Sequence, residues 1–356
     1  SWGDGTMENN KLRVALVFGG RSGEHEVSVV SAKSVGGALD RGRYEVVPMA
    51  IDRDGRWTDG ETARRILDEA PERADAVEPF AGRFRIDPRL LEDEFDVAFP
   101  VLHGPYGEDG TIQGLFEMLG LPHVGCDAAS SAVCMDKIFC KSLLRNAGIR
   151  TPEWQGFDLA TWSAQRQNIL TSCRELGLPL FVKPARLGSS VGISRVTADE
   201  QLDGAIDEAF SHGYRALVER GVAAREIEIA VLGNDEPQAS VPGEIIPGHD
   251  FYDYEDKYVD SECQLLAPAP LDERTTKDVQ ELAVAAYQTL GCSGMARVDL
   301  FLAHDGSQLW VNEVNSIPGF TSISMYPRLW GLSGLDYPAL LDELVRLALE
   351  RSPMHA

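Results

Sequence analysis

The chain has 356 residues, 44% of them hydrophobic and 25% charged, which is typical of a folded globular protein long enough for two or three domains. Its formal net charge of −23 repels phosphate backbones and excludes nucleic-acid binding through a broad basic surface. No apolar run approaches the ~18 residues of a membrane helix, and no basic segment followed by an apolar one opens the chain, so we expect a cytoplasmic protein without a membrane partner.

The N-terminal third has the pattern of an α/β domain. Two short apolar stretches predict buried strands, and the stretch after each of them predicts a helix. The strands are expected at residues 12–18 and 95–102, and the helices at 27–39 and 111–119. Residues 52–94 between the two units are polar and look like an insertion. We therefore predict an α/β domain with a parallel sheet over residues 7–129.

The rest of the chain predicts two further domains. Strands are expected at both ends of 178–197, at 216–222, 226–232, 241–246, 294–303 and 308–314, and helices at 135–146 and 272–290. We place boundaries after residues 129 and 222, giving a central domain at 130–222 and an α+β domain at 223–356. Residues 248–268 contain three tyrosines and few helix signals, and they predict a long loop that is either a functional lid or disordered.

A glycine- and serine-rich loop follows the first strand of the central domain. Residues 188–192 (GSSVG) match G-x-S-x-G, the nucleophile elbow of serine hydrolases. An elbow needs a helix directly after it, whereas β-branched residues alternate over 191–196 and predict a strand. Such a loop can instead fold over a polyphosphate, with Lys183 supplying charge. Walker and G-x-G-x-x-G motifs are absent, and for the loop alone a flexible hairpin turn is the alternative.

The C-terminal strands pair polar residues with valines. Arg297 and Asp299 are two residues apart on one strand, and Glu313 and Asn315 on the next, so each pair shares one face. Both pairs can face one cleft while the intervening valines turn to the core. Oxygen ligands of this kind suit Mg²⁺ that holds nucleotide phosphates. A solvated acidic surface is the alternative, and the apolar residues around the hairpin favour burial.

The long loop carries a third candidate element. Lys257 stands beside Tyr258 within the stretch DYEDKY at 253–258. A lysine next to a tyrosine could close over phosphates and exclude water. An aromatic-anchored surface loop is an equally good interpretation of the same residues.

Six motifs in this order resemble the ATP-grasp superfamily and, within it, the D-alanine–D-alanine ligase family, over roughly residues 12–350. They are GGRSGEHEVS (19–28), HGPYGEDG (103–110), MDK (135–137), KP (183–184) with its Gly-Ser-Ser loop, YEDKY (254–258) and NEVNSIPG (312–319). Ala185, Leu187 and Ile317 depart from the commonest family spelling, but none of them is an expected ligand. The resemblance implies a three-domain ATP-grasp architecture, with ATP clasped between the sheets of the central and C-terminal domains.

The resemblance also implies the residues that hold the nucleotide and its metals. The ATP contacts it implies are Lys137 and Lys183 on the α- and β-phosphates, Ser190 in the loop, Glu219, Arg220 and Val222 at the adenine hinge, Glu226 at the ribose and Lys257 at the γ-phosphate. Two Mg²⁺ ions, or Mn²⁺ in their place, are expected on Asp299, Glu313 and Asn315. This metal set agrees with the strand-facing argument made from the residues alone.

For the amino-acid substrates, the resemblance implies two adjoining sites. Glu24 orients the first D-alanine's ammonium near His103, with Ser189 and Tyr258 hydrogen-bonded to Glu24. The second step uses Arg297 and the Gly319 N–H as an oxyanion hole, and Ser324 with Met325 as the pocket for the second D-alanine. The catalytic set implied is Glu24, Ser189, Lys257, Tyr258 and Arg297.

Each of these residues also has an ordinary structural interpretation. Glu24 fits an acid in the first turn of a helix, where the helix dipole favours it, and His103 fits a strand-end histidine bonded to backbone. Lys137 fits a solvated helix lysine, and Ser189 fits a turn serine. The prediction therefore depends on all six motifs occurring together.

The reaction that the resemblance implies is ATP-dependent ligation of two D-alanines through a D-alanyl phosphate and a tetrahedral intermediate. It releases ADP and phosphate and serves peptidoglycan synthesis, and the family implies a homodimer. A relative that joins D-alanine to D-lactate or D-serine is the alternative, although Lys257-Tyr258 fits the dipeptide-forming type. A different ATP-grasp ligase would lose the match at Glu24, Tyr258 and Ser324, and a nucleotide-binding sensor would bind ATP without D-alanine-dependent phosphate release.

Overall fold

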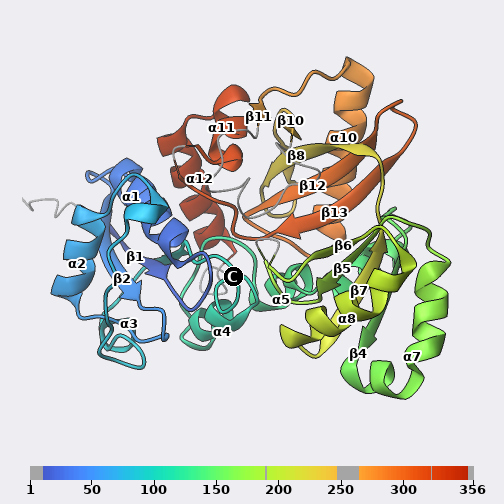
Figure 1. Cartoon of the computed structure of the whole chain (residues 1–356). Helices are drawn as coiled ribbons and strands as arrows, with labels where there is room; N and C mark the ends of the chain where they lie inside the picture. The colour runs from blue at the N-terminus through green and yellow to red at the C-terminus, as the bar shows by residue number, and fades with distance from the viewer. Residues whose placement is uncertain (1–10, 189–190, 247–263, 322, 352–356) are drawn as a thin grey trace, which may run out of the picture.

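The computed structural model describes residues 11–188, 191–246, 264–321 and 323–351. Three sheets follow one another along the chain, with strand orders β2-β1-β3, then β4-β7-β5-β6, then β11-β10-β8-β12-β13 with β9 on β8 (Figure 1). The first sheet is parallel and its strand pairs are those of an α/β domain, which confirms the predicted fold class. In the parts of the chain that the structure describes, no helix is both long and apolar enough to cross a membrane.

The N-terminal sheet is buried on both faces. Its strands are β1 (Leu12–Gly19), β2 (Tyr44–Ile51) and β3 (Val97–Pro100), and its helices include α1 (His25–Ala38), α2 (Gly60–Glu69), α3 (Arg89–Glu92) and α4 (Thr111–Met118). Residues 14–18 of β1 are all fully buried, as expected for the middle strand of a parallel sheet with both faces covered. Within the polar stretch 52–94, α2 contributes Ala63 and Leu67 to this core.

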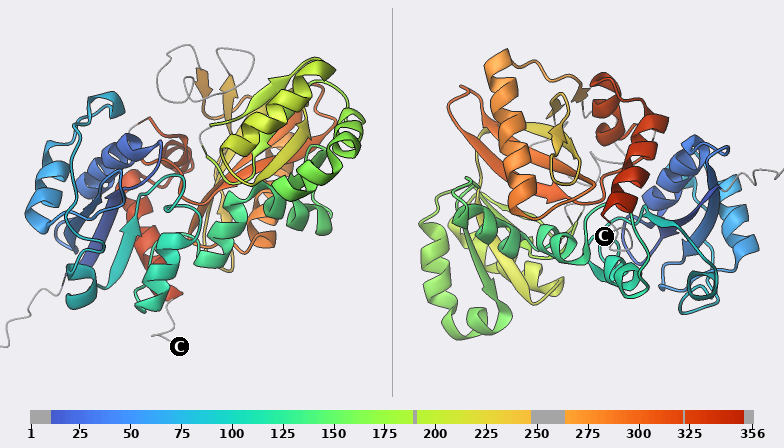
Figure 2. Two further views of the ribbon diagram at one scale, coloured as in Figure 1. Left: turned by 60° about the horizontal axis from the view of Figure 1, so that its bottom comes forward. Right: turned by 180° about the vertical axis from the view of Figure 1, so that it is seen from behind.

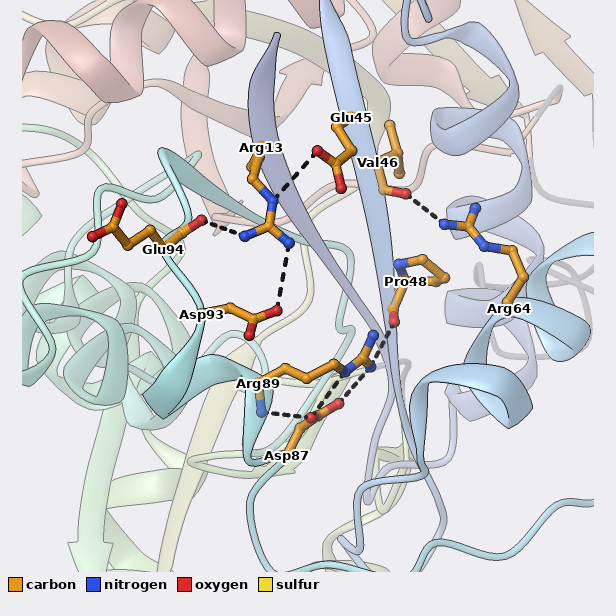
Figure 3. Close-up of polar contacts among 9 residues, drawn as sticks. All are labelled: Arg13, Glu45, Val46, Pro48, Arg64, Asp87, Arg89, Asp93 and Glu94. Carbon is orange, nitrogen blue, oxygen red and sulfur yellow. Dashed lines mark hydrogen bonds and ion pairs between the residues drawn. The ribbon is translucent and has the colours of Figure 1, made fainter. Parts of the chain in front are cut away.

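Arginines cover the open edge of β2. Arg64 donates to the Val46 carbonyl at 2.8 Å, and Arg89 donates to the Pro48 carbonyl at 3.1 Å while it also bonds Asp87 (Figure 3). Unpaired carbonyls on an edge strand are a template for pairing with other chains, and charged side chains block that pairing. Because both arginines come from 52–94, they also tie this stretch to the sheet.

A helix pair leads from the N-terminal unit into the central one. The helix predicted at 135–146 is α6 (Lys137–Asn146), and a further helix that was not predicted, α5 (Ala128–Met135), precedes it. They are separated at Asp136, whose carboxylate accepts from the backbone N–H groups of Ile138 and Phe139 and caps the second helix. Aspartate competes well for such orphan donors, which is the reason for the break.

The central sheet is antiparallel throughout. It contains β4 (Trp154–Asp158), β5 (Leu180–Pro184), β6 (Ser194–Val196) and β7 (Arg215–Arg220), packed on α7 (Leu159–Arg174) and α8 (Leu202–Ser211). The glycine-rich loop connects β5 to the strand β6, so no helix directly follows it. The elbow of a serine hydrolase is therefore excluded, as the sequence indicates.

The C-terminal sheet is antiparallel and covered by α10 (Glu273–Thr289). Its strands are β8 (Ala224–Leu232), β9 (Gln238–Ala239), β10 (Gly243–Ile246), β11 (Gln264–Leu266), β12 (Met295–Ala303) and β13 (Leu309–Asn315). β8, β10, β12, β13 and α10 lie within a few residues of the predicted positions, whereas β9 was not predicted. β11 occupies the end of the stretch predicted as a long loop, whose residues 248–263 lie outside the described residues.

The last two helices return to the N-terminal unit. α11 (Met325–Leu332) and α12 (Tyr337–Glu350) lie between the C-terminal sheet and the N-terminal helices in both views of Figure 2. Leu340, Leu344 and Leu347 of α12 belong to the same hydrophobic cluster as Val14 and Leu16 of β1. One core thus joins the first and last parts of the chain.

Candidate active site

The hairpin of β12 and β13 carries four of the predicted side chains on one face. Cross-strand pairing sets Arg297 opposite Asn315 and Asp299 opposite Glu313, while Val298 is fully buried on the other face. Arg297 donates from Nε and from a terminal nitrogen to the two oxygens of Asp299, both at 2.7 Å. Asn315 donates from Nδ2 to Asp299 at 3.0 Å. Strand alternation therefore places these groups together, as the sequence predicts.

Glu228 on the neighbouring strand β8 joins this cluster. It is paired in register with Asp299, and its Oε1 lies 3.3 Å from Arg297 Nε. Burial lowers the pKa of Arg297, but Asp299 and Glu228 raise it more, so that it lies well above its usual value. Glu228 was not predicted, although Glu226 and Glu228 alternate with isoleucines on one strand and therefore share a face.

The cluster brings several oxygen ligands together. Glu228, Asp299 and Glu313 act on Arg297, and Asn315 adds an amide. Among the residues that the structure describes, no three His, Cys, Asp or Glu side chains are grouped as a complete metal site. Two carboxylates and an amide oxygen fit Mg²⁺ or Mn²⁺ whose remaining ligands come from substrate phosphates and water.

A second cluster places a carboxylate between two lysines. Lys183 Nζ on β5 lies 2.9 Å from Oε1 of Glu219 on β7, and Lys141 Nζ on α6 lies 2.6 Å from the other oxygen. Burial raises the pKa of Glu219, but the two lysines lower it further, so the net shift is downward. Lys141 is 2% exposed, and its Nζ also lies 3.4 Å from the backbone carbonyl of Asn312.

Two lysines on one carboxylate leave a net positive charge at this position, which suits an anionic ligand. Lys141 was not predicted as a site residue, because a lysine on an amphipathic helix usually points to solvent. Its partners lie 78 and 171 residues further along the chain, and only the fold brings them together.

Lys137 lies against the glycine-rich loop. Lys137 is the first residue of α6. Its Nζ donates to the Leu187 carbonyl at 2.5 Å, and its backbone N–H donates to the Ala185 carbonyl at 2.9 Å. Arg186 in the same loop donates to the buried Asp136 at 2.8 Å. The loop and the start of α6 are therefore held as one unit.

The predicted hinge residues lie where β7 passes into β8. Arg220 is exposed at the end of β7, and Val222 is in the three-residue connection. Glu226 lies on β8, in register with Phe301 and Ile245. Together with Glu219, these positions line the junction of the central and C-terminal sheets.

Glu24 brings three distant segments together. It is 9% exposed and occupies the N-cap position of α1, yet its side chain makes no capping bond. A Cβ built on Gly104 would lie 3.4 Å from Glu24 Oε2, and one built on Gly188 would lie 3.6 Å from it. The N-terminal acid thus meets both the loop after β3 and the glycine-rich loop of the central unit.

His103 is bonded on both ring nitrogens. Nδ1 lies 3.1 Å from the Ile317 carbonyl, and Nε2 lies 3.2 Å from Ser31 Oγ. Burial lowers the pKa of His103, although Glu24 and the hydrogen bond with Ile317 oppose this shift. The structural interpretation of His103, a histidine bonded to backbone, is therefore what the structure shows.

The predicted second-substrate residues follow β13. A Cβ built on Gly319 would lie 2.7 Å from Ser324 Oγ, so any other residue here would require the serine hydroxyl to move. Ser324 Oγ also accepts from the Thr321 N–H at 3.0 Å. Met325 is 5% exposed and packs in the core beside Gly243. Four predicted residues, Ser189, Ser190, Lys257 and Tyr258, lie outside the described residues.

Two models of one protein family match this chain. Residues 13–126 match the family model for the D-ala D-ala ligase N-terminus, and residues 143–346 match that for the D-ala D-ala ligase C-terminus. The chain is 44% identical over 349 residues to a D-alanine–D-alanine ligase of Natranaerobius thermophilus, covering 96% of each chain. It is 45% identical over 356 residues to D-alanine–D-alanine ligase A of Escherichia coli K12, again covering 96% of each.

Two solved structures are similar to the whole fold. The D-alanine-D-alanine ligase from Coxiella burnetii has a TM-score of 0.80 and 38% identity, covering 97% of this chain and 96% of its own. The VanG D-Ala:D-Ser ligase from Enterococcus faecalis also has a TM-score of 0.80 and 38% identity, covering 95% of this chain and 100% of its own.

Proposed function

The chain belongs to the D-alanine–D-alanine ligase family, and we propose that it joins two D-alanines into D-alanyl-D-alanine, using ATP and releasing ADP and phosphate. The observation that supports this best is the meeting of Glu24 with the glycine-rich loop, because it sets an acid for an ammonium group beside a phosphate-binding loop. The product would serve peptidoglycan synthesis.

The first step activates a carboxylate, which is a poor electrophile until it is phosphorylated. In this proposal Lys137, Lys183 and Ser190 hold the phosphates of ATP, and Glu219, Arg220, Val222 and Glu226 hold its adenosine. Asp299, Glu313 and Asn315 would hold Mg²⁺, which neutralises phosphate charge when bound. Glu24 holds the ammonium of the first D-alanine beside the γ-phosphate.

The second step forms the peptide bond. The amine of the second D-alanine attacks the acyl phosphate, and negative charge develops on the carbonyl oxygen. Arg297 uses two N–H groups on Asp299, and its other donors can face that oxygen together with the Gly319 N–H. Ser324 and Met325 would line the second amino-acid pocket, and Ser189, Lys257 and Tyr258 would complete the lid that excludes water.

Further parts of the proposal concern organisation. We propose that the chain forms three domains over 7–129, 130–222 and 223–356, each built on one of the three sheets. We propose that the enzyme is cytoplasmic, because this chemistry requires no membrane. We also propose that it works as a homodimer, as the family resemblance implies.

One assay tests the proposed function. The purified chain is incubated with ATP and Mg²⁺ and with D-alanine, D-serine, L-alanine or D-alanine plus D-lactate, and phosphate release and product mass are measured. We expect phosphate release with D-alanine alone and a D-alanyl-D-alanine product at neutral pH. Absence of D-alanine-dependent phosphate release would reject the ligase.

The same assay tests specificity. The similarity to a D-Ala:D-Ser ligase structure makes D-serine the alternative second substrate. A mixture of D-alanine and D-serine at equal concentration should give mainly the D-alanyl-D-alanine product. A dominant D-alanyl-D-serine or D-alanyl-D-lactate product would instead assign the chain to the alternative.

A further inference from the structure

The short connection between β13 and α11 is held by the N-terminal unit. We call residues 316–320 the oxyanion segment, because it contains Gly319. Its Ile317 N–H donates to Glu108 Oε1 at 3.3 Å, and its Ile317 carbonyl lies 3.1 Å from His103 Nδ1. Its Phe320 N–H donates to Ser31 Oγ at 3.5 Å. Three peptide groups of this segment therefore bond to side chains more than 200 residues earlier in the sequence.

These side chains also bond to one another, and the directions of the bonds are fixed. A carbonyl only accepts, so His103 Nδ1 carries the hydrogen and donates to Ile317, which leaves Nε2 as an acceptor. Ser31 then donates its hydroxyl to Nε2 at 3.2 Å and accepts from the Phe320 N–H. With one hydrogen on Nδ1 and none on Nε2, a neutral His103 is compatible with all three of these hydrogen bonds.

Glu108 closes the second half of the arrangement. Its Oε2 accepts from the Gly104 N–H at 2.7 Å while Oε1 accepts from Ile317, so one carboxyl group joins the loop after β3 to the oxyanion segment. Glu24 lies close enough to Glu108 to act on it electrostatically, and so does Arg297. Glu108 therefore stands between the residues proposed for the two substrate sites.

Burial shows which residue of the oxyanion segment faces the site. Ser316, Ile317 and Phe320 are at most 3% exposed, and Pro318 is buried as well. Gly319 is the only one of the five that is partly exposed. A glycine has no side chain to hold its own N–H in place, so its position depends on the bonds of its neighbours.

We propose that Glu108 and Ser31 are positioning residues for the ligation step, which with His103 fix the oxyanion segment so that the Gly319 N–H faces the reacting carbonyl beside Arg297. This rests on the proposed function. Groups that stabilise a transition-state charge must be held within about half an ångström of their productive position. The side chains that hold a backbone donor therefore affect turnover without touching substrate.

The test compares three variants of the full chain. Ser31→Ala removes the hydroxyl that links Phe320 to His103, and Glu108→Gln replaces one of the two acceptor oxygens by a donor. Ser240→Ala is the matched control, because Ser240 is also fully buried and its hydroxyl also links two groups, here the Ala230 N–H and the Val241 carbonyl. For each, kcat, the KM for ATP, ATP affinity by titration and the melting temperature are measured.

We expect Ser31→Ala and Glu108→Gln to lower kcat roughly 10-fold or more, since loss of one oxyanion donor costs about 100-fold. ATP affinity and the KM for ATP should stay within about twofold of the parent, and Ser240→Ala should keep its kcat at a similar melting temperature. Unchanged kcat in one of these variants, or a fall in kcat matched by an equal fall in ATP affinity, would overturn the positioning role of that residue.

The failures of the two proposals are distinguishable. If the parent chain shows no D-alanine-dependent phosphate release, the proposed function fails before any variant is measured. If the parent is active and both variants keep its kcat, the proposed function stands and only the positioning role is wrong. Glu108→Gln and Ser31→Ala act on different bonds, so one informative variant remains if the other does not fold.

Discussion

At the scale of single residues, the site depends on buried charges that compensate one another. Glu219 is 2% exposed and would be costly as an isolated carboxylate, but Lys141 and Lys183 each bind one of its oxygens. The proposed function gives Glu219 and Lys183 a contact with ATP, whereas it gives Lys141 no contact with substrate. Its contribution is to keep Glu219 and Lys183 in place.

Replacement of Lys141 by methionine tests this. The change keeps a long apolar stem but leaves half of the Glu219 charge without compensation, so we expect a loss of about 3–5 kcal/mol in the free energy of unfolding, measured by denaturant titration. Lys33→Met is the control, since Lys33 pairs with Glu72 on the surface and should change stability by less than about 1 kcal/mol. Similar losses in both variants would contradict the buried role.

Glu108 gives the stability of the protein a pH dependence. Desolvation, and then the nearby Glu24, raise the pKa of Glu108 to about 8 against the donating Gly104 and Ile317 N–H groups and Arg297. Between its ordinary value of 4.5 and about 8, the folded chain keeps a proton that the unfolded chain releases. The contribution of this group to stability therefore falls as pH rises through that window.

We expect the free energy of unfolding of the parent to fall relative to that of Glu108→Gln as pH rises from about 5 to about 8, because glutamine does not titrate. The comparison uses the slopes, since the variant also loses an acceptor and starts from a lower stability. Denaturant titrations at four pH values measure it. Parallel curves for the two proteins would show that Glu108 keeps its ordinary pKa.

Residue patterns predicted part of this site. Alternation along two strands was enough to place Arg297, Asp299, Glu313 and Asn315 on one face, because the rule depends only on neighbours in sequence. Lys141, Glu108 and Ser31 could not be found in this way. Each is defined by a partner more than 70 residues away. Glu108 stands in the motif at 103–110, but the sequence around it does not reveal its bond to Ile317.

At the scale of elements, Asp136 separates α5 from α6 and thereby directs Lys137. Its carboxylate is fully buried, caps α6 and pairs with Arg186 and Arg215. The sequence predicts the start of this helix at residue 135, whereas α6 begins directly after Asp136, which caps it. Asp136 is held in its capping position by the two arginines, which come from the central sheet and its loop.

Asp136→Ala should therefore do more than remove a cap. We expect a stability loss well above the ~1 kcal/mol of an ordinary N-cap, together with weaker ATP binding, because Lys137 and the glycine-rich loop lose their common support. Asp272→Ala, at the N-cap of α10, is the control that should cost less and leave ATP affinity unchanged. Equal effects of the two variants on ATP affinity would rule out the supporting role.

At the scale of the whole molecule, the core that joins β1 to α12 makes the first and last parts of the chain interdependent. Leu344 of α12 is fully buried in the cluster that also contains Val14 and Leu16. Sequence patterns alone did not predict this, since a strand and a helix at opposite ends of the chain show no sign of each other. Three sheets were predictable, but not the packing between the first and the last units.

Leu344→Ala should accordingly loosen the N-terminal sheet. We expect a loss of about 2–5 kcal/mol in the free energy of unfolding and faster hydrogen exchange at the amides of β1, more than 300 residues away in sequence. Leu332→Ala is the control, because that side chain is 48% exposed. Exchange that rises in α12 but not in β1 would show that the two units are independent.

This shared core also bears on how the chain is made. A ribosome releases β1 and its neighbours long before α12 has been synthesised, so the part of the N-terminal core that α12 covers, beside β3 and α1, stays uncovered until that helix has been made. The edge arginines on β2 are in place far earlier, because Arg64 and Arg89 follow that strand closely in sequence. During that interval the two arginines protect the sheet edge, whereas the part of the core that α12 later covers is the surface that a chaperone would bind.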